Sequence, residues 1–198
     1  MILFVDLGTF YAIAGSPFHG QAPRIMSKNT SRFSHGERLD LFDRDLVRMI
    51  FGAQPDQLAM RNSQHKARAV YYERVHRHEG TDAAHLWGAF YGAMAIRCHN
   101  YGIPIYGVPV QEIKRHATGL VNATKAQMIA AAKLNGWEPH VMDGTPGGND
   151  NAADALWGLA LCEKSGAIFH AGTKAAQNRA AERALEKRAT GGTRKAKQ

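Results

Sequence analysis

The chain has 198 residues, of which 44% are hydrophobic and 21% charged, and its formal net charge is +8. This composition is sufficient for one domain with a buried core and excludes disorder over the whole length. Two cysteines exclude a disulfide framework and a paired-cysteine zinc site, and the chain lacks the apolar run of roughly 20 residues that a membrane helix needs. We therefore expect a cytoplasmic protein.

The positive charge is concentrated near the C-terminus. Nine lysines and arginines and two glutamates lie in residues 164–198, so this stretch carries +7 and residues 1–163 carry only +1. Almost nothing apolar follows Phe169, which predicts a domain at 1–165 and a basic, partly helical or disordered tail at 166–198. Such a tail either neutralises nucleic-acid phosphates or only keeps the protein soluble, and we expect the former.

Short apolar runs in the first part of the chain predict an antiparallel meander, with strands at 2–5, 11–15 and 23–27. A helix over 35–51 follows, because Ser34 and Glu37 have the spacing of a capping box and apolar residues then recur with helical period. Four acidic residues are expected on the solvent-facing side of that helix: Glu37, Asp40, Asp43 and Asp45.

Strands and helices alternate in the rest of the chain, which predicts an α/β fold with a mixed sheet. Gly88 and Gly92 would let a neighbouring element pack closely, either a second copy of the chain or another part of the same domain. The predicted strands are 69–75 and 103–110, and the predicted helices are 81–99 with Thr81 as its cap, 111–118, 122–134 with Asn122 as its cap, and 149–162.

Four acidic residues lie at the margin of the predicted core. Asp6 ends a strand expected at the centre of the sheet, and Glu73 lies in strand 69–75. Asp150 and Asp154 are four residues apart and so share one face of a helix. Asp6 could simply close a turn and Asp150 could cap its helix, but buried carboxylates are costly unless they are paired or bind a cation. An all-oxygen set suits Mg²⁺, with Mn²⁺ as a substitute, and two such ions hydrolyse phosphodiesters.

These residues resemble those of a known family. Asp6 in FVDLG, Glu73 in YYERVHRHEGTDAAH, and Asp150 with Asp154 in NDNAADALWGLA are similar to the RuvC-type Holliday junction resolvases of bacteriophages, within the ribonuclease H-like superfamily. The resemblance covers residues 1–163. It implies a ribonuclease H-like fold, with a five-stranded mixed sheet flanked by helices.

The resemblance also implies an activity. A family member would be a Mg²⁺-dependent endonuclease, a homodimer that nicks opposed strands of a four-way junction in branched DNA. It would work in the cytoplasm, that of a bacterial host if a phage encodes it. A helicase or packaging partner would not be identifiable from the sequence.

The chain departs from the family pattern at two points. Residues 54–60 resemble the lead-in to the second catalytic strand of the family, but Arg61 stands where the glutamate belongs. We therefore assign that role to Glu73 and interpret 57–67 as an insertion. A phenylalanine that the family carries three residues after the glutamate is replaced by His76.

Basic residues complete the site that the resemblance implies. Lys125 matches a position close to the scissile phosphate, where a cation stabilises charge that develops in the transition state. A zinc site at His76, His78 and His85 is a weaker alternative for the histidines. The residues expected to bind DNA are Arg74, His76, Arg77, His78, Lys114, Arg115 and Lys125.

Two other functions remain open on sequence grounds. A non-catalytic DNA-binding or architectural protein would account for the tail but not for four carboxylates at a core margin. An actin-like or sugar-kinase-type ATPase would share the DLGT sequence at 6–9 and a glycine-rich loop at 143–148. Such ATPases normally need two such domains, for which 198 residues are too few.

Overall fold

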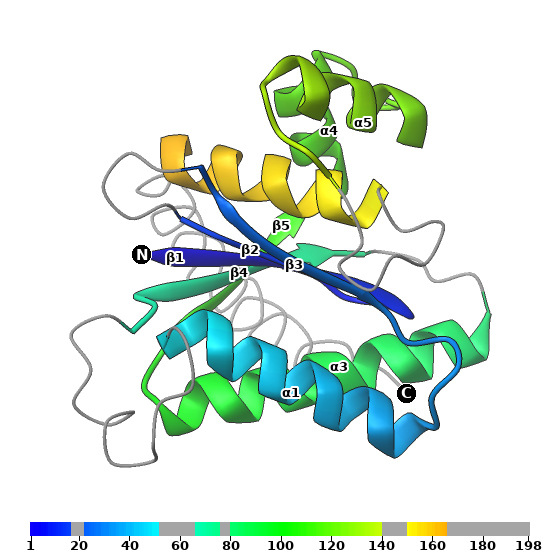
Figure 1. The fold of residues 1–198 in the computed structure, drawn as a ribbon, viewed down its shortest axis with the longest axis vertical. Coiled ribbons are helices and arrows are strands. Elements are labelled where there is room, and N and C mark those ends of the chain that lie inside the picture. The colour runs from blue at the N-terminus through cyan, green and yellow to red at the C-terminus, as the bar shows by residue number, and fades with distance from the viewer. Residues whose placement is uncertain (17–21, 52–65, 76–79, 140–149, 166–198) are drawn as a thin grey trace, which may run out of the picture. The chain divides into compact units, whose positions relative to one another are not determined.

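A five-stranded mixed sheet forms the centre of the protein (Figure 1), in the strand order β3-β2-β1-β4-β5. β1 pairs antiparallel with β2, which pairs antiparallel with β3, and β1 pairs parallel with β4, which pairs parallel with β5. The predicted meander and the predicted central place of the first strand are therefore confirmed. The strands are β1 (Ile2–Asp6), β2 (Phe10–Gly15), β3 (Arg24–Asn29), β4 (Ala69–Arg74) and β5 (Ile105–Pro109).

The computed structural model describes residues 1–16, 22–51, 66–75, 80–139 and 150–165. The chain divides into two units, Met1–Lys164 and Ser165–Gln198, and the predicted basic tail at 166–198 lies outside the described residues. No helix in the described ranges is both long enough and apolar enough to span a bilayer.

Helices cover both faces of the sheet (Figure 1). One face carries α1 (His35–Phe51) and α3 (Thr81–Asn100). The other carries helix 150–165, with α4 (Val110–Thr118) and α5 (Lys125–Leu134) beyond it.

The alternation of side chains along β1 divides its residues between these two layers. Leu3 and Val5 are buried in the core that α1 and α3 close. Phe4 points the other way and contacts helix 150–165 at Gly158. Asp6 shares the face of Phe4, so the first strand delivers its carboxylate to the layer of helix 150–165 and not to the main core.

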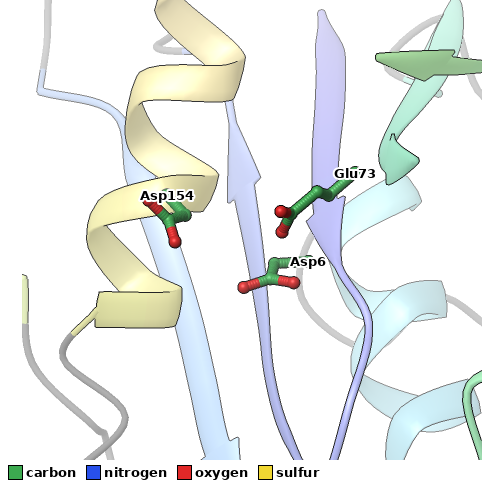
Figure 2. A group of neighbouring side chains, drawn as sticks. All are labelled: Asp6, Glu73 and Asp154. Carbon is green, nitrogen blue, oxygen red and sulfur yellow. The ribbon is translucent and has the colours of Figure 1, made fainter. Parts of the chain in front are cut away.

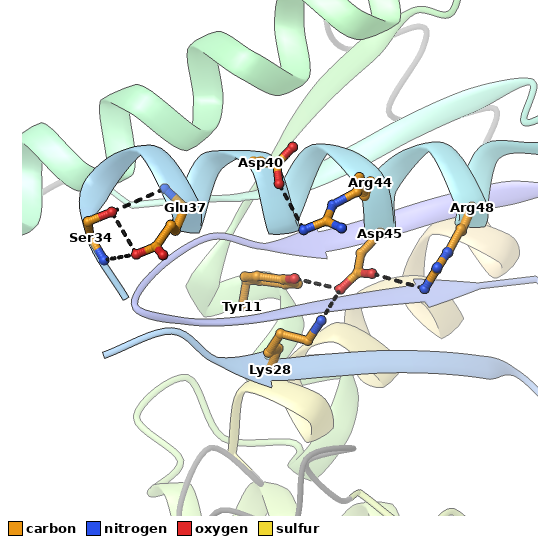
Figure 3. Close-up of polar contacts among 8 residues, drawn as sticks. All are labelled: Tyr11, Lys28, Ser34, Glu37, Asp40, Arg44, Asp45 and Arg48. Atoms are coloured by element: carbon orange, nitrogen blue, oxygen red, sulfur yellow. Dashed lines mark hydrogen bonds and ion pairs between the residues drawn. The ribbon is translucent and has the colours of Figure 1, made fainter. Parts of the chain in front are cut away.

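Two predicted helix caps are wrong. α5 is capped by Thr124 and not by Asn122, because the side chains of Thr124 and Gln127 form a reciprocal capping box. α3 begins after Gly80, which makes no side-chain cap, so Thr81 is the first helical residue. The capping box of Ser34 and Glu37 at the start of α1 is confirmed (Figure 3).

The prediction that all four acidic residues of α1 face solvent is wrong for Asp45. This residue is only 3% exposed and accepts a hydrogen bond from the Tyr11 hydroxyl at 2.6 Å (Figure 3). Lys28 Nζ lies 3.0 Å from the same carboxylate, and Arg48 lies 3.8 Å from its other oxygen. Helical periodicity alone cannot show that the polar side of α1 meets polar side chains of β2 and β3.

Gly88 and Gly92 do not serve packing within the described part of the domain. A Cβ built on either glycine would meet no described atom within 4 Å. The sequence left open whether this pair packs against a second copy of the chain or against another part of the same domain. The described residues do not support the second role.

Candidate metal centre

Asp6 and Glu73 lie at the ends of two neighbouring parallel strands. β1 and β4 run in register from Ile2 opposite Ala69 to Val5 opposite Tyr72, so the next residue of each strand, Asp6 and Glu73, follows on the same face. Asp6 is 7% exposed, whereas Glu73 is half-buried. The carboxyl ends of parallel strands thus bring together two acidic residues that are 67 positions apart in the sequence.

Helix 150–165 supplies the third carboxylate. Asp154 points from its first turns toward the two strand ends (Figure 2). Oxygen atoms of Asp6, Glu73 and Asp154 all lie within 4.8 Å of one another. Within the described ranges this is the only group of three or more side chains of metal-binding type found so close together, and His85 is not part of it.

The three carboxylates repel one another in a poorly solvated position. Burial, followed by the charges of Glu73, Asp154 and Asp150, holds the pKa of Asp6 well above its usual range. Burial likewise raises the pKa of Asp154 to about 7, with Glu73 and Asp150 adding to the effect. Lys114 and Lys125 oppose the rise at Asp154, which puts both cations near the cluster.

The donor set fits a hard divalent cation. The Oδ1 atom of Asp154 is buried and has no hydrogen-bond partner among the described residues, although it lies beside two other carboxylates. Such an arrangement is costly for the folded protein unless a cation binds there. Oxygen ligands of this kind are those that Mg²⁺ and Mn²⁺ take in proteins.

Asp150 is not part of this group of three and pairs with Lys125. The Nζ atom of Lys125 lies 2.6 Å from Asp150 Oδ2, and the Asp150 side chain is 15% exposed whereas that of Lys125 is 80% exposed. This contact raises the pKa of Lys125. The carboxylate of Asp150 still acts on Asp6 and Asp154 through its charge, so it lines the same site.

Asn151 is a residue that the sequence interpretation passed over. Its side-chain amide donates a hydrogen bond to the backbone carbonyl of Phe10 at the start of β2. This bond ties the first turn of helix 150–165 to the sheet one turn before Asp154. A polar residue between two acidic ones in NDNAAD was the available signal, but only the fold shows its partner.

The predicted DNA-binding residues are only partly described. Arg74 is exposed at the end of β4, and Arg115 is exposed on α4, where it pairs with Glu112 at 2.7 Å. Lys114 is half-buried on the same helix, near Asp154. The predictions for His76, Arg77 and His78 lie outside the described residues, as do Arg61 and the glycine-rich loop at 143–148.

No protein-family model and no curated protein matches the chain. The chain does match solved structures. The structure of Thermus thermophilus RuvC matches with a TM-score of 0.55 and 16% sequence identity, over 83% of this chain and 96% of that one. The chain has the RuvC fold. A structure of T. thermophilus RuvC in complex with a Holliday junction substrate also matches, with a TM-score of 0.53 and 17% identity over 79% and 90% of the two chains.

The fold predicted from the sequence is therefore confirmed. The RuvC fold is the ribonuclease H-like α/β architecture, and the five-stranded mixed sheet between helical layers agrees with it. In this chain the acidic cluster lies where two central strands end under a helix, and Lys125 of α5 contacts Asp150 next to it.

Proposed function

We propose that this protein is a divalent-metal-dependent endonuclease that hydrolyses phosphodiesters in branched DNA, with the four-way junction as its main substrate. The observation that carries the proposal is the convergence of Asp6, Glu73 and Asp154 within 4.8 Å on a RuvC fold. The match to RuvC holding a Holliday junction substrate supports the choice of DNA.

Asp6, Glu73 and Asp154 are the residues proposed to hold Mg²⁺, with Asp150 as a fourth carboxylate at the edge of the site. A pair of Mg²⁺ ions would supply an activated water and stabilise the leaving oxygen of the phosphodiester. Asp6 is buried, whereas the Lys125 side chain beside Asp150 is 80% exposed, so we propose that the substrate approaches from the side of Lys125.

Two lysines are proposed to act on the phosphate. Lys125 has an exposed ammonium group beside Asp150, where it can contact a non-bridging phosphate oxygen and stabilise the charge that develops during cleavage. Lys114 lies near Asp154 from the α4 side and adds positive charge opposite the carboxylates. The two cations thus offset the repulsion between an acidic site and an anionic substrate.

A titration of Mg²⁺ against cleavage of a four-way junction and of a linear duplex tests the proposal. We expect Mg²⁺-dependent nicking of the junction, and we expect Asp6→Asn to abolish nicking while junction binding is retained, because the change removes a carboxylate that would also repel phosphates. Asp40→Asn, at an exposed pair on α1, is the matched control and should behave as wild type. Binding without cleavage by the wild type at any Mg²⁺ or Mn²⁺ concentration would favour an architectural protein instead.

We also propose that the protein acts as a homodimer through the outward side of α3. Gly88 and Ala89 are exposed there, Ile96 is 65% exposed, and a Cβ on Gly88 or Gly92 would meet no described atom. Two nicks in opposed strands need two active sites, which a second copy supplies. Light scattering of the wild type and of Ile96→Arg tests this: the wild type should be dimeric and the variant shifted toward monomer.

A further inference from the structure

The turn between α4 and α5 exposes two neighbouring aliphatic side chains. Leu120 is 53% exposed and Val121 is 36% exposed. Across the described residues, four large hydrophobic side chains are exposed, and three of them lie on this α4–α5 hairpin: Leu120, Val121 and Leu134. Two aliphatic side chains are too small a patch to indicate an interface by themselves, so their backbone and charged surroundings decide what they contact.

This turn is fixed at both ends. α4 ends at Gly119, whose φ of 78° only glycine adopts readily and whose N–H donates to the carbonyl of Arg115 at 2.8 Å. The Leu120 N–H donates to Thr118 Oγ1 at 3.1 Å, and the capping box of Thr124 starts α5. Leu120 and Val121 are therefore presented by an ordered backbone, so binding through them costs little further ordering.

The pair lies close to the candidate metal centre. Val121 precedes Lys125 by four residues, so their Cα atoms are at most about 15 Å apart. Lys125 in turn contacts Asp150 at 2.6 Å. That span is less than half of one turn of duplex DNA, which is about 34 Å long. A DNA strand whose phosphate contacts Lys125 therefore passes within reach of Leu120 and Val121.

The charge around the pair identifies the partner. Residues 113–137 contain Lys114, Arg115, Lys125 and Lys133 and no acidic residue. Arg115 pairs with Glu112 and Lys125 pairs with Asp150, so four cations stand against two carboxylates and the excess positive charge attracts phosphates. Aliphatic side chains inserted between bases, with cations on the flanking phosphates, are a known way for proteins to hold distorted DNA.

We propose, on the basis of the function proposed above, that Leu120 and Val121 form an apolar contact with the bases of branched DNA beside the cleaved phosphate. Base faces that are stacked in a linear duplex become accessible at a branch point. The contact therefore favours branched over linear DNA, and it adds affinity that does not depend on salt because no counterion is released.

The test uses the full chain and compares Leu120→Ser/Val121→Ser with wild type by fluorescence anisotropy on a four-way junction over a series of salt concentrations, without divalent metal. We expect the double variant to bind on the order of tenfold more weakly at every salt concentration, with an unchanged slope of log K against log salt. Binding to linear duplex should change less. Leu134→Ser is the matched control, because Leu134 is 90% exposed at the far end of α5 and should not matter.

Lysine variants distinguish contacts with phosphates from the apolar contact with bases. Lys133→Gln or Lys125→Gln should flatten the salt slope by about one where the lysine contacts a phosphate. 2-Aminopurine at the branch point should also become more fluorescent on binding wild type than on binding the double variant. If the urea midpoint shows that the double variant is unfolded, the single variant Leu120→Gln replaces it in the binding experiment, because it changes only one side chain.

Each outcome bears on one proposal. Wild type and double variant that bind the junction equally well would overturn the apolar contact and leave the nuclease proposal standing. Loss of junction binding that accompanies a change in oligomeric state would also overturn it, because the pair would then contact a second copy. Wild type that fails to bind any branched DNA would overturn the proposed function itself.

Discussion

Gly158 lies so close to the Phe4 ring that no residue with a side chain fits at position 158. A Cβ built on Gly158 would overlap the Phe4 ring at Cζ and at both Cε carbons. Phe4 precedes Asp6 by two residues in β1, and Gly158 follows Asp154 by one helical turn. The contact therefore sets the distance between strand and helix next to the acidic cluster.

Gly158→Ala is expected to push helix 150–165 away from β1. Overpacking of this kind should lower the free energy of unfolding by about 1–3 kcal/mol, measured with urea. It should also weaken Mn²⁺ binding measured by calorimetry, because Asp154 moves from Asp6. Gly36→Ala, at an open position in the first turn of α1, is the control and should be neutral or stabilising by up to about 1 kcal/mol. Equal Mn²⁺ affinity in the two variants would contradict the spacing role, whereas partial rescue of Gly158→Ala by Phe4→Leu would support it.

The raised pKa of Asp154 predicts how pH affects the metal-free protein. Folded Asp154 keeps its proton to about pH 7, whereas the unfolded chain releases it near the ordinary value of 3.8. The folded state thus binds more protons in this window, so its stability falls as pH rises from about 4 to about 7 and is flat above. Asp154→Asn should reduce the loss of unfolding free energy between pH 5 and pH 8 by about 2–3 kcal/mol.

Saturating Mg²⁺ supplies the second arm of that experiment. A cation favours the ionised carboxylate, so wild type in Mg²⁺ should gain stability at pH 8 and little at pH 5. Asp154→Asn should gain less at either pH. A pH dependence that is the same in wild type and variant would show that Asp154 titrates normally.

The contact between Lys125 and Asp150 predicts a loss of rate greater than the loss of binding. Lys125→Gln should lower single-turnover cleavage of the junction by about 10²–10³, the range found when one donor to a developing charge is removed. Lys133→Gln, exposed on the same helix, should leave the rate unchanged. Recovery of activity in the double variant with Asp150→Asn would show that Lys125 only neutralises Asp150. Because Asp150 also lines the proposed metal site, we expect the double variant to be at least as slow as Lys125→Gln alone.

Asp45 is predicted to matter for stability and not for cleavage. Asp45→Ala leaves Tyr11 and Lys28 without their shared partner and should cost about 3 kcal/mol of unfolding free energy, since Lys28 is still partly solvated. Asp40→Ala, at an exposed pair with Arg44, should cost less than about 0.5 kcal/mol. Urea unfolding of the two variants measures both. Equal losses would mean that burial of Asp45 adds nothing.

The sequence predicted those features that depend on local pattern. The strand Ile2–Asp6 follows from a short continuous apolar run, and the helix His35–Phe51 follows from apolar residues that recur every 3.6 residues. The capping box of Ser34 and Glu37 follows from spacing alone. The positions of Asp6, Glu73 and Asp154 stood out because a carboxylate inside an apolar run is costly wherever the chain goes.

Contacts between distant segments were decided only by the tertiary structure. Whether Asp45 faces solvent depends on β2 and β3 meeting the polar side of α1, and whether Gly88 or Gly158 is the glycine at a close contact depends on what packs there. The pairing of Lys125 with Asp150 has the same origin, since 25 residues separate them in the chain. A repeating pattern records which residues avoid water, but not which partner covers each of them.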